Sequence, residues 1–207
     1  MLELLIASTN PGKLREIQAI LAEVPGWQSD RLKLLQPADL GLRLDVQEDG
    51  QTYAENAALK AGTYCRAAQK VTLADDSGLE VDALGGQPGL HSARYAPQPG
   101  ATDSDRRAFL LQNLKGHARP WTARFRCTVA LATPAGEIYY SEGVCPGEII
   151  EQERGHNGFG YDPIFLLTEQ GRTMAELSMT EKNRLSHRAR AVQAAVPFLE
   201  KIIKELE

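Results

Sequence analysis

The sequence predicts an α/β protein with a mixed β-sheet and two lobes around a cleft. In the first third of the chain, apolar runs of strand length alternate with segments of helical spacing. Further on, two runs of alternating polarity are separated by a Pro-Ala-Gly turn, which predicts a hairpin. The 207 residues suffice for one large domain or two small lobes with a substantial core. We therefore expect a single two-lobed domain over residues 1–207.

The first elements have clear start signals. Residues 2–7 form an apolar run typical of a buried strand. Asn10 is then a good helix N-cap, and Pro11 suits the first helical position. A capping-box pattern at residues 52–55 predicts an alanine-rich helix that runs to about Gln69. A strand that ends at Asp75 should follow directly.

The remaining elements follow from composition and periodicity. Residues 84–102 are rich in Gly and Pro, which predicts an ordered loop, and a helix over 104–114 should come next. Alternation over 125–131 and 138–144 predicts the two strands of the hairpin, with one face buried. An apolar stripe near the C-terminus predicts a helix that kinks or restarts at Pro197.

Composition excludes several classes of protein. The formal net charge of −4 weighs against binding to a nucleic-acid backbone, where a basic face is expected. The three cysteines lack metal or redox spacing and are typical of buried apolar positions in a reducing compartment. The N-terminal apolar run is too short for a signal peptide, and no apolar stretch approaches the length of a membrane span. We therefore expect a cytoplasmic protein that binds neither membranes nor nucleic acid.

The segment Asp75-Asp76-Ser77-Gly78 is the first candidate site. Two carboxylates at a strand terminus, followed by a hydroxyl and a glycine, would form a compact site for Mg²⁺, which binds carboxylate oxygens together with substrate phosphates. The alternative, a turn in which the two aspartates only cap backbone N–H groups, is equally compatible with this segment alone.

A second candidate lies between the first strand and the first helix, at Ser8-Thr9-Asn10-Pro11-Gly12-Lys13. A helix N-terminus with a nearby lysine favours a phosphate. A Walker-type loop is excluded, because that pattern needs a further glycine and a Ser or Thr after the lysine. A simple helix cap with a solvated lysine is the alternative.

Weaker signals come from Glu48 and Asp49, a loop cluster of acidic residues, and from Lys60 on the following helix. Each is more often solvated than functional when considered alone.

The segment over residues 155–163 is more specific. Glycines on both sides of Phe159 leave its ring open for stacking on a base, and Asp162 could accept a hydrogen bond from a ring N–H. The alternative is an aromatic turn that fills the core. Further along, Lys182 precedes Ser186-His187-Arg188, a group of donors at a predicted helix start that suits carbonyl or phosphate oxygens.

Seven motifs now occur in one order along nearly the whole chain. They are Ser-x-Asn-x-x-Lys from Ser8, Glu-Asn-Ala from Glu55, Ala-Asp-Asp-Ser-Gly-Leu from Ala74, Ala-Leu-Gly-Gly-x-Pro-Gly from Ala83, Ser-Ala-Arg-Tyr from Ser92, Gly-Phe-Gly-Tyr-Asp-Pro from Gly158 and Ser-His-Arg from Ser186. In this combination the chain resembles the inosine/xanthosine triphosphate pyrophosphatase family, enzymes that hydrolyse deaminated purine nucleoside triphosphates.

The resemblance implies a long central mixed β-sheet with two α/β lobes around a nucleotide cleft, and a homodimer. It implies Asp76 as proton acceptor and metal ligand, with Asp75 and Glu48 as further Mg²⁺ ligands. Because Gln47 is next to Glu48, the register of that acidic ligand is the least secure. The substrate-binding residues that it implies are Ser8, Thr9, Asn10, Pro11, Gly12, Lys13, Lys60 and Ser77 for the triphosphate, and Phe159, Gly160, Tyr161, Asp162, Lys182, His187 and Arg188 for the base.

The implied reaction is attack of water on the α-phosphorus of ITP, dITP or XTP, which gives a nucleoside monophosphate and pyrophosphate. Thr9 stands where many relatives have glycine, which affects how closely the backbone approaches the phosphates. A site of buried donors would reject adenine, which lacks the 6-carbonyl. The alternatives are a related pyrophosphatase that prefers pyrimidine triphosphates and, in another class, a nucleotide-binding regulatory protein without catalysis.

Overall fold

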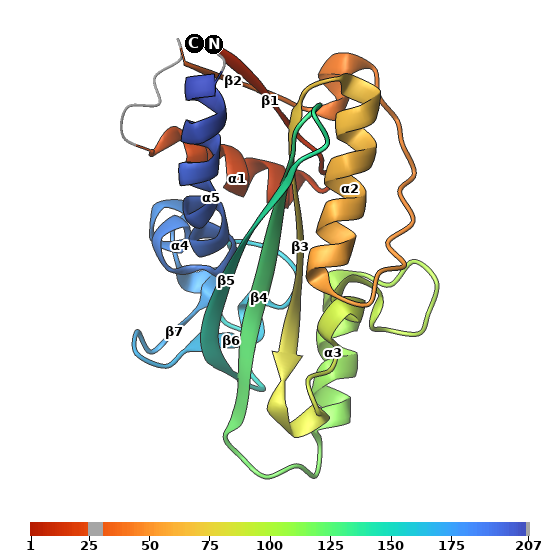
Figure 1. Ribbon diagram of the computed structural model, residues 1–207. Coiled ribbons are helices and arrows are strands. Elements are labelled where there is room, and N and C mark those ends of the chain that lie inside the picture. Colours follow the sequence, from red (N-terminus) through yellow and green to blue (C-terminus); the bar gives the residue numbers. More distant parts are fainter. Residues whose placement is uncertain (25–30, 206–207) are drawn as a thin grey trace. The chain divides into compact units, whose positions relative to one another are not determined.

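A computed structural model describes residues 1–24 and 31–205 (Figure 1). Within these residues a seven-stranded sheet has the strand order β2-β1-β3-β4-β5-β6-β7. The strands are β1 (Leu2–Ile6), β2 (Leu32–Leu35), β3 (Val71–Val81), β4 (Trp121–Ala132), β5 (Ile138–Ile149), β6 (Phe165–Leu167) and β7 (Arg172–Thr173). The helices are α1 (Pro11–Ala22), α2 (Tyr53–Ala68), α3 (Asp103–Leu114), α4 (Met179–Leu185) and α5 (His187–Glu205).

The sheet is mixed, as predicted. Strand β1 pairs in parallel with both β2 and β3. Strand β6 pairs in antiparallel fashion with both β5 and β7. The alternation of strands and helices in the first third of the chain gives the parallel part, because parallel neighbours need a crossover connection.

The chain divides into two compact units, and each has its own core. The first unit comprises Met1–Asp76, Cys127–Gly143 and Arg188–Glu207, and the second comprises Ser77–Arg126 and Val144–His187.

The first unit buries both faces of its strands. Along β1, Leu4 belongs to a core cluster that contains residues of α1 and α5, whereas Leu5 belongs to a cluster that contains residues of α2. Because successive strand residues point to opposite faces, α1 and α5 cover one face and α2 covers the other (Figure 1). A strand buried on both faces is expected to be a continuous apolar run, as residues 2–7 are.

The second unit packs around one apolar cluster that includes Leu79 of β3, Leu110 of α3, Phe125 of β4 and Phe165 of β6. The Gly- and Pro-rich segment predicted as a loop contains a short 3₁₀ helix, Gly89–Arg94, and another, Asp82–Leu84, ends at its first residue. Ser92 connects this segment to β3, since its hydroxyl accepts from the Leu79 N–H at 2.9 Å and donates to the Gly89 carbonyl at 2.6 Å.

One prediction about elements is wrong. Strand β3 does not end at Asp75 but continues to Val81, so the aspartates lie inside a strand and not in a turn. That prediction was based on a local signal, Asp-Asp-Ser-Gly, which the packing of the surrounding apolar residues overrides. The C-terminal helix does not restart at Pro197 but is one element, α5, with this proline inside it, and the kink stays a prediction.

Candidate functional site

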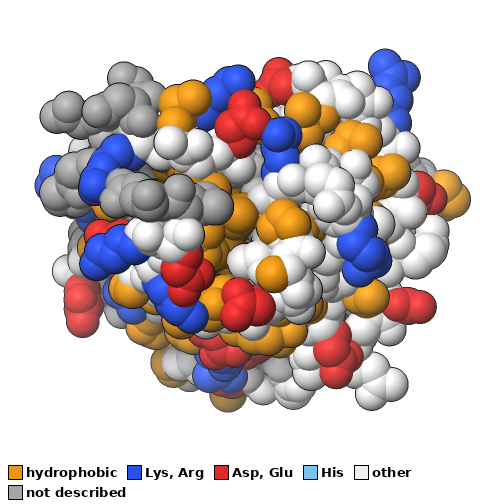
Figure 2. Space-filling model, turned by 45° about the horizontal axis from the view of Figure 1, so that its top comes forward, with side chains coloured by type: hydrophobic (Ala, Val, Ile, Leu, Met, Phe, Trp, Pro, Cys, Tyr) orange, Lys and Arg blue, Asp and Glu red, His pale blue; other side chains and the backbone are white. Residues whose placement is uncertain are grey.

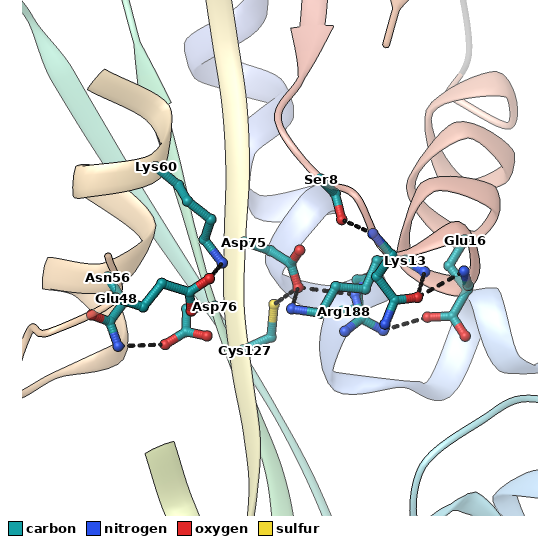
Figure 3. A network of polar contacts seen from close by, with 12 residues as sticks. Ser8, Lys13, Glu16, Glu48, Asn56, Lys60, Asp75, Asp76, Cys127 and Arg188 are labelled. Carbon is teal, nitrogen blue, oxygen red and sulfur yellow. Dashed lines mark hydrogen bonds and ion pairs between the residues drawn. The ribbon is translucent and has the colours of Figure 1, made fainter. Parts of the chain in front are cut away.

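The direction of each side chain on β3 determines the layout of the site. Val71 and Leu73 belong to the core cluster of α1 and α5, and Ala74 belongs to the cluster of α2. By the same alternation, Asp75 faces α1 and α5, and Asp76 faces α2. Figure 3 shows the two carboxylates on opposite sides of the strand. The adjacent aspartates therefore do not form the single compact carboxylate pair that was expected.

On the α2 side, Asp76 is held by Asn56. The Asn56 side-chain Nδ2 donates to Asp76 Oδ2 at 3.1 Å (Figure 3). Its Oδ1 accepts from the Gly50 N–H at 2.9 Å. Asn56 is almost fully buried. A Cβ at Gly50 would lie 2.7 Å from Asn56 Oδ1, so this turn requires glycine. Asn56 thus connects Asp76 to the loop that carries the acidic residues.

Glu48 and Lys60 lie on this same side of β3. Glu48 Oε1 and Lys60 Nζ are 3.1 Å apart, and the Lys60 side chain is largely buried (Figure 3). Burial raises the pKa of Asp76 above its ordinary value, and the Glu48 charge adds to this, while Lys60, Lys13 and the Asn56 hydrogen bond oppose it. Asp76 is thus a buried carboxylate with a raised pKa near a second carboxylate. A positive charge at this place would stabilise its ionised form.

On the other side, Asp75 is at the centre of a buried ionic cluster. Its Oδ2 lies 3.1 Å from Lys13 Nζ and 3.1 Å from Arg188 Nε, and it accepts from the Cys127 thiol at 3.8 Å. Arg188 also donates through Nη1 to Glu16, and both residues are almost fully buried. Two cations and two anions are therefore enclosed together (Figure 3).

This cluster keeps Asp75 ionised. Burial alone would raise its pKa, but the charges of Lys13, Arg188 and Lys60 outweigh that effect and hold the pKa far below its ordinary value. Asp75 Oδ1 is buried and has no hydrogen-bond donor among the described residues. Any role of Asp75 as a metal ligand would depend on that oxygen and stays a prediction.

The predicted phosphate turn has the expected helix cap but not a solvated lysine. Asn10 Oδ1 accepts from the N–H groups of Gly12 and Lys13, at 2.8 and 3.2 Å, and Ser8 Oγ accepts from the Asn10 N–H. The helix amides that an anion would use are thus already bonded in this state. What the turn adds to the site is the positive charge of Lys13, directed at Asp75.

In the second unit, residues 158–162 fold around Asp162. Its Oδ2 accepts from the Phe159 N–H at 2.9 Å and from Lys182 Nζ at 2.6 Å. Lys182 Nζ also lies 5.1 Å from the centroid of the Phe159 ring. Gly158 has φ +78°, and a Cβ there would lie 2.0 Å from Asp162 Oδ2, so the tight wrap needs glycine. The structure gives Asp162 an internal partner in Lys182.

The neighbouring aromatic residue fills the core. Tyr161 is buried, and its hydroxyl donates to the Ser92 carbonyl at 2.9 Å, whereas Phe159 remains partly exposed. His187 is also buried and stacks on Phe125, with ring centroids 4.7 Å apart. Three of the residues predicted to bind the base belong to the second unit, namely Phe159, Lys182 and His187. Another, Arg188, belongs to the first unit.

Two residues of this site were not predicted as site residues. Asn56 lies in the Glu-Asn-Ala motif, and that motif is the signal that would have indicated it. Glu16 follows Lys13 by one helical turn, and the sequence alone does not distinguish it from a surface glutamate. Among the described residues, no group of three or more His, Cys, Asp or Glu side chains lies close enough to hold a metal.

Comparison with known proteins places the chain in a family. The family model described as "Ham1 family" matches residues 4–198. A dITP/XTP pyrophosphatase of Shouchella clausii is 46% identical over 201 residues, covering 97% of this chain and 98% of that protein. A dITP/XTP pyrophosphatase of Thermus thermophilus is 46% identical over 196 residues, covering 93% of this chain and 89% of that protein.

Solved structures agree with these sequence comparisons. The Staphylococcus aureus Ham1 protein has a TM-score of 0.82 at 38% identity and covers 96% of this chain and 98% of its own. A Ham1 protein from Coxiella burnetii has a TM-score of 0.84 at 37% identity and covers 97% of this chain and 100% of its own. The chain therefore belongs to the Ham1 family.

Proposed function

We propose that this protein hydrolyses the deaminated purine nucleoside triphosphates ITP, dITP and XTP to the nucleoside monophosphate and pyrophosphate. Such a reaction would remove these nucleotides before they enter DNA or RNA. The names of the relatives support the substrate class. The observation that carries the proposal is the α2 side of β3, where buried Asp76 is oriented by Asn56 and lies in the field of Glu48 and Lys60.

The donor set on this side fits a hard divalent cation. Asp76 and Glu48 supply carboxylate oxygens, the ligands that Mg²⁺ prefers. Burial is the main cause of the raised pKa of Asp76, and a bound cation would offset that cost to its ionised form. We propose that Asp76 and Glu48 hold Mg²⁺, with Asp75 behind the strand in a supporting role. When bound, Mg²⁺ would neutralise phosphate charge and lower the pKa of coordinated water.

Asp76 is then the proton acceptor. Water attacks the α-phosphorus, Asp76 takes the proton, the bond from the α-phosphorus to the bridging oxygen breaks, and pyrophosphate leaves. Lys60 and Lys13 offset the charge of the triphosphate, together with the other residues of the 8–13 turn and Ser77. For Lys60 this means exchanging its ion pair with Glu48 for a phosphate partner, which becomes favourable once Glu48 binds a cation.

The second unit supplies the proposed contacts to the base. Phe159 offers a partly exposed ring for stacking, with Gly160, Tyr161 and Asp162 shaping the loop around it. Lys182 and His187 are donors suited to the 6-carbonyl that hypoxanthine and xanthine share, and Arg188 was predicted to act with them. Arg188 uses its Nε and Nη1 within the ionic cluster, so its contact with a base stays a prediction.

The remaining proposals concern partners and location. We propose a cytoplasmic homodimer that does not bind nucleic acid. On the face drawn in Figure 2, the Lys and Arg side chains of described residues are interspersed with acidic and apolar ones. This pattern fits the net charge of −4 and differs from the continuous basic surface typical of nucleic-acid binding. No helix in the described ranges has the length and apolar character of a membrane span.

The direct test is to incubate the protein with Mg²⁺ and, separately, ITP, dITP, XTP, ATP, GTP and dTTP. Pyrophosphate and orthophosphate are both quantified. We expect pyrophosphate, selectively from the first three nucleotides. Orthophosphate release would contradict the bond assignment. Pyrophosphate mainly from dTTP would favour the pyrimidine alternative, and binding without turnover would favour the regulatory one.

A further inference from the structure

The backbone of the Phe159 loop is fixed by helix α3. Gly160 follows Phe159, and side chains of α3 bond both its N–H and its carbonyl. Its N–H donates to Asp103 Oδ2 at 2.8 Å, and its carbonyl accepts from Arg107 Nη1 at 2.9 Å. Asp103 and Arg107 are four residues apart and so lie on the same face of α3, as this double contact requires.

Both α3 side chains are themselves held in place. Arg107 makes a bidentate pair with Glu153, with Nε and Nη2 at 2.8 and 2.9 Å from the two carboxylate oxygens. Asp103 is paired with Arg106 one turn further along α3. A capping box of Thr102 and Asp105 fixes the start of the helix. Arg107 therefore presents its remaining nitrogen to Gly160 with little freedom.

The loop is thus fixed at two neighbouring points by different means. Asp162 binds the Phe159 N–H from inside the loop, and α3 binds Gly160 from outside. Gly160 has φ +61°, and a Cβ there would meet nothing within 4 Å. Glycine is therefore favoured at this position by the left-handed backbone conformation and not by close packing. A change of this left-handed conformation would redirect the Phe159 ring. The contacts from α3 oppose such a change.

We propose that Asp103 and Arg107 are positioning residues for the base: they hold the Gly160 peptide so that the Phe159 ring is preorganised for stacking on the purine. This inference rests on the proposed function of the Phe159 loop. Neither side chain needs to touch the nucleotide. Preorganisation reduces the entropy cost of ordering the loop when the nucleotide binds. Loss of preorganisation should therefore weaken binding of the substrate and of the transition state to the same extent.

The first test is steady-state kinetics with dITP. We expect Asp103→Ala and Arg107→Ala each to raise KM about tenfold and to change kcat by less than about twofold. Asp103→Asn keeps an oxygen acceptor of the same size, and it should keep KM within about threefold of the wild type. The matched control is Ser104→Ala, which changes an exposed side chain in the same helix turn that takes no part in the bonds to Gly160. Its KM should stay within about twofold of the wild type.

A double-mutant cycle tests whether these residues act through Phe159. In a Phe159→Leu background, Asp103→Ala should raise KM further by less than about twofold, because the ring that it positions is gone. Independent, additive effects would contradict the proposal. A fall in kcat at unchanged KM, or an equal effect of Ser104→Ala, would also contradict it.

Amide hydrogen exchange separates this inference from the proposed function. Without any nucleotide, residues 158–162 should exchange about tenfold faster in Asp103→Ala and Arg107→Ala than in the wild type, and Ser104→Ala should leave their exchange unchanged. If the wild type releases no pyrophosphate from dITP, the proposed function fails, and exchange alone decides whether α3 fixes the loop. Unchanged exchange in both variants would overturn the inference in either case.

Discussion

Adjacent residues of one strand have opposite electrostatic states in this protein. Asp75 and Asp76 are both buried, yet the pKa of Asp75 is far below its ordinary value and that of Asp76 is above it. The difference comes from the face of β3 on which each lies. Asp75 contacts two cations directly, whereas Asp76 has a neutral amide partner and a nearby glutamate. A stable anion and the proposed proton acceptor are thus separated by one peptide unit.

Replacing Asp76 should separate activity from stability. Asp76→Asn removes the proposed proton acceptor, so turnover of dITP should fall by at least about 100-fold. Because the folded state holds the Asp76 pKa above its unfolded value, an ionised Asp76 weakens stability at neutral pH, and this cost disappears as pH falls through the folded pKa. Without divalent cations, Asp76→Asn should therefore have a higher Tm than the wild type at neutral pH. Undiminished turnover or a lower Tm would contradict these assignments.

Asn56 should matter to both stability and turnover. Asn56→Ala leaves Asp76 Oδ2 and the Gly50 N–H without this partner, which should cost about 1–3 kcal/mol in the free energy of unfolding. Turnover should fall as well, because the Asp76 carboxylate loses its orientation. Glu55→Ala is the matched control, since Glu55 bonds the Gln51 N–H from the same helix without contacting Asp76. Equal turnover in the two variants would show that Asn56 does not orient the proton acceptor.

At the scale of elements, the ionic cluster connects α1, β3 and α5 within the first unit. Glu16 and Lys13 come from α1, Asp75 from β3 and Arg188 from α5. A buried cluster is not in itself a large source of stability, but removing one member leaves an uncompensated charge.

Glu16→Ala should therefore destabilise the protein by about 3 kcal/mol or more, measured by denaturant unfolding. Glu3 is the matched comparison, because it also pairs with two cations, Lys33 and Lys70, but at the surface. Glu3→Ala should change stability far less, since solvent screens exposed pairs. A similar loss in the two variants would mean that burial of the cluster has no special importance.

The start of α4 should show a distinct pH dependence. Hydrogen bonds from Arg172 and from Ser178 lower the pKa of Glu181 to about 2. The stability that Glu181 contributes is present above its unfolded pKa of about 4.5 and is lost as pH falls towards about 2. Wild type should be more stable than Glu181→Gln at neutral pH, and the difference in Tm should shrink across that window. A difference that stays constant with pH would show that the ionised carboxylate is not the cause.

At the scale of the whole molecule, the sequence predicted most elements because their signals are local. Asn10 and Pro11 begin α1, Thr52 caps α2, and Gln69 ends α2 in a left-handed conformation. The family and the mixed sheet were also predicted correctly. The end of β3 was not, because Asp-Asp-Ser-Gly imitates a turn, whereas the buried partners of those residues come from distant segments.

In the candidate site, too, local signals predicted some features, and contacts between distant segments determined others. The motifs contain two residues of the candidate site, Asp76 and Asn56, although Asn56 was not predicted as a site residue. They did not indicate which side chains face each other. The pairing of Arg188 with Glu16 joins residues 172 positions apart, and that of Lys182 with Asp162 joins residues 20 apart. Such pairings depend on the register of strands and helices, which no local pattern encodes.

The central claim is that Asp76 directs water at the α-phosphorus of a deaminated purine triphosphate. It is tested most directly by hydrolysing dITP in H₂¹⁸O with Mg²⁺ and analysing both products by mass spectrometry. The account predicts one ¹⁸O atom in dIMP and none in pyrophosphate, with label transfer at least about 100-fold slower in Asp76→Asn. Label in pyrophosphate or release of labelled orthophosphate would place the attack on another phosphorus and contradict the account.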